Sequence, residues 1–487
     1  MGMASFADLA QQYIDGDWRP GKGSWDIIDF NPYNGDKLAS ITVATTEEID
    51  QAYRAAERAQ KEWAELNPYA RRQVIERALR IVEEREAEYA ELIMAELGGT
   101  RLKAGFELML VKEMLREATH WAVGAEGRIL PSMTDGKENR VYRLPVGTVC
   151  VISPFNFPLF LAIKSVAPAL ALGNAVVLKP HQNSPVTGGS LIARIFEEAG
   201  LPKGLLNVVI TDIAEIGDAL IEHPVPKVIS FTGSDKVGRH VATVAAANFK
   251  RCVLELGGNS ALIVLDDADV DYAVDAAVFS RYVHQGQVCM AANRVLVDRS
   301  LEQEFTEKFV AKVKTLRTGD PTDPQTHIGP LINSTQADAV TRVVEDAVRD
   351  GATALLRGET QGNVVQPTVL TGIPENSSVL NQEIFGPVAL IIPFDGDDDA
   401  VRIANDTPYG LSGAVHTADT DRGVRIAKRI DTGMIHINDS TVADEPIVSF
   451  GGEKSSGVGR LNGDATIEAF TTTKTITVQH GRTAFPF

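Results

Sequence analysis

The sequence predicts an α/β protein with two lobes, each a mostly parallel sheet covered by helices. Three patterns carry this prediction. Short apolar runs alternate with helical stretches from residue 147, the same alternation starts again near residue 261, and β-prone segments stand at 137–146 and at the end of the chain. Near-continuous apolar strands that alternate with helices are typical of βαβ units.

The chain before residue 124 is expected to be helical. Thr45 and Glu48 form a capping box ahead of an amphipathic stretch. Two further amphipathic helices are predicted over 71–97 and 101–123, and Gly98-Gly99 separates them.

The two lobes follow in order. In the first lobe we expect strands at 148–152, 175–178, 206–210, 228–231 and 252–256, with helices at 159–172, 185–199, 213–222 and 236–247. In the second we expect strands at 261–265 and 294–297, and helices at 269–284, 301–316, 400–405 and 421–430. The C-terminal tail is β-prone and is expected to pair with 137–146.

Composition excludes several classes of function. Of 487 residues, 47 are Lys or Arg and 65 are Asp or Glu, so the formal charge is −18, which disfavours nucleic acid and anionic lipid as partners. The three cysteines are too few for a disulfide framework and form no zinc pattern, so no metal is expected. Neither a targeting segment nor a run of about 20 apolar residues is evident, which predicts a soluble cytoplasmic protein.

Cys289 is the candidate nucleophile. An isolated cysteine is more often a small buried apolar residue, and Cys150 and Cys252 fit that interpretation because both lie in apolar strand runs. Cys289 lies in HQGQVCMAANR, whose Gly and Gln suit a loop. A catalytic thiol must be reachable and able to ionise.

Polar residues at the ends of predicted strands complete the candidate site. Glu255 ends an apolar strand, where a carboxylate can activate water that attacks a thioester. Asn156 follows another strand, and its amide can donate to an oxyanion. Lys179 suits a ribose or phosphate contact, and the turn at Gly233-Ser234 opens a helix that can receive a pyrophosphate. Each signal alone is weak, since an exposed strand end or a plain turn explains it equally well.

Taken in order, these motifs resemble the aldehyde dehydrogenase superfamily over almost the whole chain. The matching segments are PFNFP, LKP, FTGSDKVG, LELGGNS, GQVC, EIFGPV, NDTPYGLSGAV and FGGEKSSGVGR. The resemblance implies that Cys289 attacks an aldehyde, that Asn156 and the Cys289 N–H stabilise the oxyanion, and that Glu255 activates the hydrolytic water.

The resemblance also implies a dinucleotide site. Lys179 would contact the adenosine ribose and Gly233-Ser234 the pyrophosphate, while Glu383 would hold the nicotinamide ribose with Phe385 beside it. Two positions depart from the usual pattern: Phe155 replaces Trp, and Gln182 stands where NAD-preferring members often carry Glu. A neutral amide would not repel a 2′-phosphate, so NADP is expected beside NAD.

The segment HINDSTVADEP, within 433–452, resembles the benzaldehyde and vanillin dehydrogenase branch and implies an aromatic aldehyde. Three alternatives stay open: an aliphatic or semialdehyde substrate, transfer of the acyl group to CoA, and a non-catalytic scaffold. A cysteine hydrolase with His284 as base would leave the cofactor motifs without a role.

The resemblance implies three structural parts and a homo-oligomer. A Rossmann-like NAD(P)-binding domain would span 1–124 and 146–256, an α/β catalytic domain 257–470, and a small β oligomerisation flap 125–145 and 471–487. The family is usually dimeric or tetrameric through such a flap.

Overall fold

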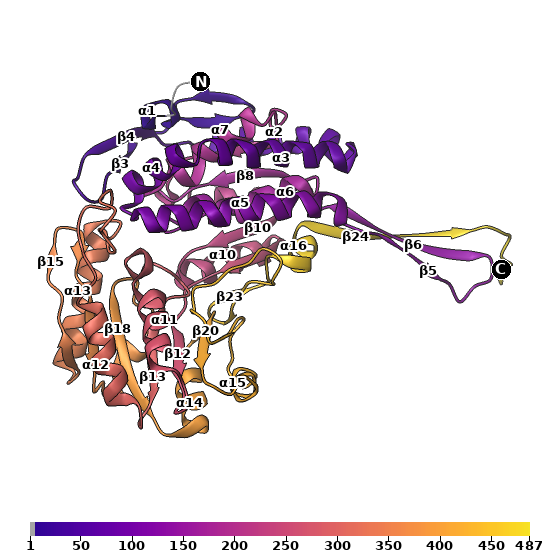
Figure 1. Cartoon of the computed structure of the whole chain (residues 1–487). Coiled ribbons are helices and arrows are strands. Elements are labelled where there is room, and N and C mark those ends of the chain that lie inside the picture. Colours follow the sequence, from indigo (N-terminus) through magenta and orange to yellow (C-terminus); the bar gives the residue numbers. More distant parts are fainter. Residues whose placement is uncertain (1–4) are drawn as a thin grey trace.

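The computed structural model of the chain describes residues 5–487 and has two sheet-based lobes and a projecting arm (Figure 1). The first sheet has the strand order β2-β1-β9-β8-β7-β10-β11-β23, in which β9 to β11 run parallel and β1, β2 and β23 are antiparallel additions. Its strands are Asp17–Arg19, Gln12–Ile14, Leu206–Val208, Ala175–Lys179, Thr148–Ile152, Pro226–Thr232, Arg251–Glu255 and Gly457–Val458, in that order.

Helices cover this sheet because its central strands are apolar on both faces. Helices α2 and α6 both pack against β7 and β8, and α3 and α5 form a further layer on α6. The helices of this lobe are α1 Phe6–Leu9, α2 Thr46–Glu65, α3 Pro68–Glu84, α4 Glu86–Leu97, α5 Arg101–Gly124, α6 Pro158–Ala171, η1 Val186–Ser190, α7 Leu191–Glu198, α8 Ile213–Ile216, α9 Ala219–Glu222 and α10 Asp235–Ala247. The predicted capping box of Thr45 and Glu48 is present at the start of α2.

The second sheet has the order β14-β17-β18-β13-β12-β20-β21 and is parallel except for β14. Its strands are Thr353–Leu356, Thr368–Thr371, Val388–Phe394, Ala292–Asp298, Ser260–Val264, Gly413–His416 and His436–Ile437. The helices of this lobe are α11 Val270–Tyr282, η2 Val283–Gly286, α12 Glu302–Val313, α13 Ser334–Arg349, η3 Ser378–Asn381, α14 Gly396–Asn405 and α15 Thr420–Ala427. Helix α16 (Gly463–Phe470) packs against α6 of the first lobe and leads into the arm.

The arm is a three-stranded antiparallel sheet that projects away from both lobes (Figure 1). β24 (Thr471–Gln479) pairs along its whole length with β6 (Lys137–Pro145), and β5 (Arg128–Pro131) pairs with the other edge of β6. The predicted pairing of the C-terminal tail with 137–146 is therefore confirmed up to residue 479. Small two-stranded sheets elsewhere join β3 Asp26–Phe30 to β4 Lys37–Thr42, β15 Thr360–Gln361 to β16 Val364–Val365, and β19 Tyr409–Gly410 to β22 Glu453–Lys454.

Several predicted elements are wrong or incomplete. Residues 12–42 contain the strands β1 to β4 rather than helix. The sequence did not predict these strands because they are short, most are partly exposed, and none has a long apolar run. The predicted helix 71–97 is two helices that meet at Arg85, and 213–222 is broken at Gly217, whose φ is +51°. Helix α13 and the strands β14 to β18 between 353 and 394 were not predicted.

Two parallel sheets and an arm match the predicted α/β class. The boundaries of the three domains stay a prediction. The position of residues 256–259, between β11 of the first sheet and β12 of the second, supports the predicted boundary at 256/257. In residues 5–487 no helix combines the length and the apolar character needed to cross a bilayer.

Candidate active site

The candidate site lies where parallel strands of the first sheet end. Strand register places Ile152 beside Lys179, Phe231 beside Ile152, and Thr232 beside Glu255, so these strand ends are level. Ligands of open α/β sheets bind at such an edge. A cavity of about 490 Å³ opens there, and the second lobe closes it with Cys289, Glu383 and Phe385.

Cys289 is presented by a left-handed turn. Helix α11 ends at Tyr282, and His284, Gln285 and Gly286 then take φ values of +49°, +57° and +76°. Gln285 secures this turn, because its Nε2 donates to the carbonyls of Gly98 (3.0 Å) and Pro330 (2.8 Å). The turn directs the chain back to the cavity, and Cys289 is partly buried at its wall.

The Cys289 thiol is protonated at rest. Burial, followed by the nearby carboxylates of Glu383 and Glu255, raises its pKa to about 12. Attack on an electrophile therefore requires a base that removes the proton. Cys150, buried in β7, and Cys252, half-buried in β11, are also free thiols, but neither lines the cavity.

Glu255 is a candidate base, because its carboxylate acts on the pKa of the Cys289 thiol and no hydrogen bond engages it in the described chain. It is 4% exposed, and neither carboxylate oxygen has a hydrogen-bond partner within residues 5–487. Burial raises its pKa to about 8, while the Lys164 ammonium opposes that rise. A carboxylate with such a pKa can accept and release a proton near neutral pH.

Asn156 lies in the loop between β7 and α6, with its side chain 4% exposed and lining the cavity. Its Nδ2 donates to the Gln287 carbonyl at 2.9 Å, which leaves its second amide hydrogen free for another acceptor. This bond ties Asn156 to the turn that presents Cys289. The two residues therefore share one wall of the cavity.

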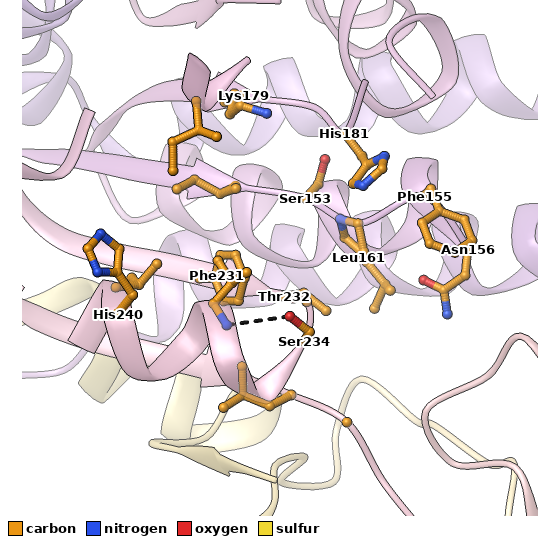
Figure 2. Close-up of a pocket in the computed structure, with 18 of the residues that line it drawn as sticks. Ser153, Phe155, Asn156, Leu161, Lys179, His181, Phe231, Thr232, Ser234 and His240 are labelled. Atoms are coloured by element: carbon orange, nitrogen blue, oxygen red, sulfur yellow. Dashed lines mark hydrogen bonds between the residues drawn. The ribbon is translucent and has the colours of Figure 1, made fainter. Parts of the chain in front are cut away.

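The opposite part of the cavity combines a lysine with a helix start. Figure 2 shows Lys179 and His181 on one side and Ser234 at the N-terminus of α10 on the other. Ser234 caps α10 by accepting from the Val237 N–H, and Gly233 precedes it. Backbone N–H groups at a helix N-terminus attract anions, so this part can receive a pyrophosphate.

Glu383 and Phe385 line the middle of the cavity from the second lobe. The Glu383 carboxylate accepts from the Gly258 N–H at 3.0 Å, and burial raises its pKa to about 7. A Cβ on Gly257 would lie 2.7 Å from Glu383, so only glycine leaves this carboxylate its place. Phe385 packs edge-on against Phe155, with ring centroids 5.8 Å apart.

Two predicted site residues do not line the cavity: Gln182 is exposed on a loop, and Glu255 is buried at the end of β11, directly before the lining residues Leu256 and Gly257. His181 and Asp212 line the wall instead, and the sequence analysis missed both. Asp212 lies close enough to Lys179 to raise the pKa of the lysine, which burial lowers to about 8 overall. No local motif distinguishes His181 and Asp212, because strand ends far apart in sequence bring them to the cavity.

A buried ion pair beside Glu255 was also missed. Lys164 on α6 and Asp444 are 2.6 Å apart and almost fully buried, and the Lys164 ammonium lies 3.3 Å from the centre of the Phe450 ring. Both charges act on the pKa of Glu255. Asp444 belongs to HINDSTVADEP, the segment that resembles the benzaldehyde and vanillin dehydrogenase branch. The sequence therefore indicated the segment that contains Asp444, but it did not indicate the pairing of Asp444 with Lys164.

The fold and the site define a class: a two-lobed α/β protein in which a free cysteine, Cys289, lines a cavity at the ligand-binding edge of a Rossmann-like sheet. The chain belongs to the aldehyde dehydrogenase family, whose model matches residues 18–476. The resemblance predicted from its motifs is therefore confirmed. Within residues 5–487 no group of three or more His, Cys, Asp or Glu is placed to hold a metal ion.

Relatives and solved structures cover nearly the full chain. It is 55% identical to the benzaldehyde dehydrogenase YfmT of Bacillus subtilis over all of both chains, and 46% identical to a vanillin dehydrogenase of Corynebacterium glutamicum over 98% of this chain and 99% of that one. The crystal structure of a salicylaldehyde dehydrogenase from Pseudomonas putida G7 with salicylaldehyde has a TM-score of 0.95 at 35% identity, and the match covers 98% of this chain and 99% of that chain.

Proposed function

We propose that this protein oxidises an aromatic aldehyde to its carboxylic acid with NAD, through a thioester on Cys289. One observation carries the proposal: a single cavity holds the thiol, the Asn156 amide and a dinucleotide-sized groove from Lys179 to Glu383. The printed names of the benzaldehyde, vanillin and salicylaldehyde dehydrogenases support the aromatic class.

The chemistry of the chain's own residues follows from their positions. Glu255 removes the Cys289 proton, and the sulfur bonds to the aldehyde carbon. The resulting oxyanion accepts hydrogen bonds from the Asn156 Nδ2 and the Cys289 N–H. Bound NAD would accept the hydride. Glu255 releases the first proton to solvent and then removes a proton from water, and the water oxygen bonds to the acyl carbon. The C–S bond breaks to release the acid, and the sulfur takes the proton back from Glu255.

The residues of the cavity fit NAD. Lys179 can donate to ribose hydroxyls, Gly233 and Ser234 can hold the pyrophosphate at the start of α10, and Glu383 can accept from the second ribose. We also propose that NADP is accepted, because Lys179 offsets part of the charge of Asp212; Gln182, on which the sequence-based expectation rested, lies outside the cavity wall. The titles of solved relatives include NAD-dependent and NADP-dependent enzymes.

An aromatic cluster next to Asn156 supports an aromatic substrate. Phe157 packs edge-on with Phe106 of α5 (6.2 Å between centroids, 87°), which packs edge-on with Phe279 of α11 (6.4 Å, 79°). The exposed fraction rises from 5% at Phe157 to 37% at Phe279, so the cluster runs from the surface to the residue that follows Asn156. Aromatic rings favour edge-to-face contacts of this kind, so such a cluster would stabilise the ring of an aromatic substrate that packs against it.

We further propose a cytoplasmic homodimer or homotetramer assembled through the arm. Free cysteines suit a reducing compartment. The arm exposes Ile129, Leu130 and Ile476, and large exposed side chains of this kind mark interfaces. Light scattering should give a multiple of 52.5 kDa, and Ile129→Asp should reduce it.

Initial rates with benzaldehyde, vanillin and a short aliphatic aldehyde, each with NAD or NADP and with or without CoA, test the function. We expect the aromatic aldehydes to have the higher kcat/KM and no requirement for CoA. An aliphatic preference would refute the substrate class, and a CoA requirement would refute hydrolysis of the thioester.

A further inference from the structure

Arg281 is the largest fully buried side chain of the described residues, and it has no acidic partner within hydrogen-bond distance among residues 5–487. It lies in the last turn of α11, three residues before the left-handed turn begins. A buried cation without an ion pair is costly unless its hydrogen bonds are satisfied. The acceptors of its guanidinium therefore indicate what it does.

The guanidinium joins two catalytic segments that are about a hundred residues apart in sequence. Its Nη2 donates to the Gly286 carbonyl at 3.1 Å, in the turn that presents Cys289. The same nitrogen donates to the carbonyls of Ile384 (2.9 Å) and Gly386, which flank Phe385 and follow Glu383. One side chain thus holds the thiol turn against the segment that lines the middle of the cavity.

A second path closes a ring of contacts. Arg281 Nη1 donates to the Asn293 side-chain oxygen, and Asn293 Nδ2 donates to the Gly258 carbonyl at 3.5 Å. The Gly258 N–H in turn binds Glu383 at 3.0 Å. Since Glu383 is covalently adjacent to Ile384, Arg281 reaches this acid from both sides.

Glycine is required where the ring is tightest. A Cβ on Gly286 would lie 2.3 Å from Arg281 Nη2 and 2.4 Å from the Gly386 carbonyl oxygen, and one on Gly258 would lie 2.1 Å from the Cys289 carbonyl oxygen. At both glycines the backbone is too close to its neighbour to accommodate a side chain. The ring therefore fixes their separation.

We propose that Arg281 is a positioning residue that sets the distance between the Cys289 turn and the Glu383–Phe385 segment, and hence between the thiol and the cofactor. This inference rests on the proposed function, because it assigns these segments to substrate and cofactor. Arg281 itself lines no part of the cavity. A lysine in its place keeps the charge but cannot form the forked set of bonds.

The test compares Arg281→Lys with reactions that need only one of the two segments. The alkylation of Cys289 by iodoacetamide without cofactor, and hydrolysis of 4-nitrophenyl acetate, need the thiol turn but not the Glu383–Phe385 segment. We expect both to change less than about threefold, while kcat for benzaldehyde oxidation falls roughly 10²-fold, as for a misplacement of about 1 Å. The affinity for NAD, measured by titration of protein fluorescence, should fall as well. The isotope effect with benzaldehyde deuterated at the aldehyde carbon should increase, because hydride transfer becomes slower.

Arg294→Lys is the matched control. Arg294 is also a buried arginine bound to backbone carbonyls, but its acceptors are Asn259, Ile403 and Ala404, none of which belongs to the thiol turn or to the Glu383–Phe385 segment. We expect it to lower stability without raising the isotope effect. Asn293→Ala, which cuts the ring and keeps Arg281, should reproduce the Arg281→Lys pattern and serves if that variant folds poorly.

Two results would overturn the proposal: a fall in alkylation and esterase rates as large as the fall in oxidation, or the same pattern in Arg294→Lys. Wild-type oxidation of benzaldehyde tests the proposed function separately. If it is absent, that function fails, and alkylation and NAD affinity in the variants still test whether Arg281 joins the two segments.

Discussion

Replacement of Glu255 by glutamine should slow the enzyme and stabilise its fold. The carboxyl is buried without a hydrogen-bond partner in the described chain, and its pKa is about 8 instead of an ordinary value of 4.5. The folded state therefore holds this proton more tightly than the unfolded state. As the pH rises from 4.5 to 8, the unfolded chain ionises first and stability is lost.

The magnitude follows from the two pKa values. At pH 7 only about one folded molecule in ten has Glu255 ionised. The difference between the two pKa values lowers the free energy of unfolding at pH 7 by about 3 kcal/mol relative to its value below pH 4.5. The amide of the glutamine variant would resemble the protonated acid at every pH. Thermal unfolding of Glu255→Gln should therefore match that of the wild type near pH 4.5 and have a higher midpoint at pH 7 and 8.

The kinetic consequence has the opposite sign. The wild-type rate should rise about tenfold between pH 7 and 9 as Glu255 ionises. In Glu255→Gln this rise should vanish and hydrolysis of the thioester should slow by about 10²–10⁴-fold. Stopped-flow absorbance at 340 nm, across pH, measures the first turnover of NADH against the steady rate. The reasoning is refuted if the variant keeps the wild-type pH profile, or if it is less stable than the wild type at pH 8.

Three further changes test the site. Lys164→Met should shift the pH–rate profile to higher pH, because the cation that lowers the pKa of Glu255 is gone. It should also lower the free energy of unfolding by about 3–5 kcal/mol, because Asp444 is left buried without its partner. Unfolding curves and pH–rate curves measure these two effects, and an unchanged pH–rate profile contradicts the assignment. Cys289→Ala should abolish aldehyde oxidation and ester hydrolysis yet keep NAD binding by calorimetry, so surviving NADH production would exclude the thioester. Asp212→Asn, which preserves the helix cap, should raise kcat/KM with NADP roughly tenfold, and no gain would remove this carboxylate from cofactor choice.

Local patterns predicted the elements that dominate the buried core. The strands β7, β8, β10 and β11 were found because each contains a run of apolar residues, as expected for strands that have helices on both faces of the sheet. The strands β1 to β4 escaped because such short strands, most of them partly exposed, have no long apolar run. Their structure depends on pairing with distant segments, which periodicity does not encode.

The site residues also divide into those that local sequence predicted and those that depend on distant contacts. Asn156, Glu255 and Cys289 were found because each stands in a distinctive motif beside a predicted strand or loop. Lys164 and Arg281 were not, since an isolated basic residue in an apolar helix acquires its role only through partners such as Asp444, 280 positions away. Their importance is a property of tertiary contacts rather than of local sequence.

The pairing of β6 with β24 also has a consequence for synthesis. On the ribosome, residues 137–145 emerge more than three hundred residues before 471–479, so β6, the middle strand of the arm, keeps one open edge until β24 has been synthesised. Open strand edges pair with other chains. A product truncated before β24 could fold much of its lobes but not complete the arm, so assembly through this sheet would admit only chains translated beyond residue 479.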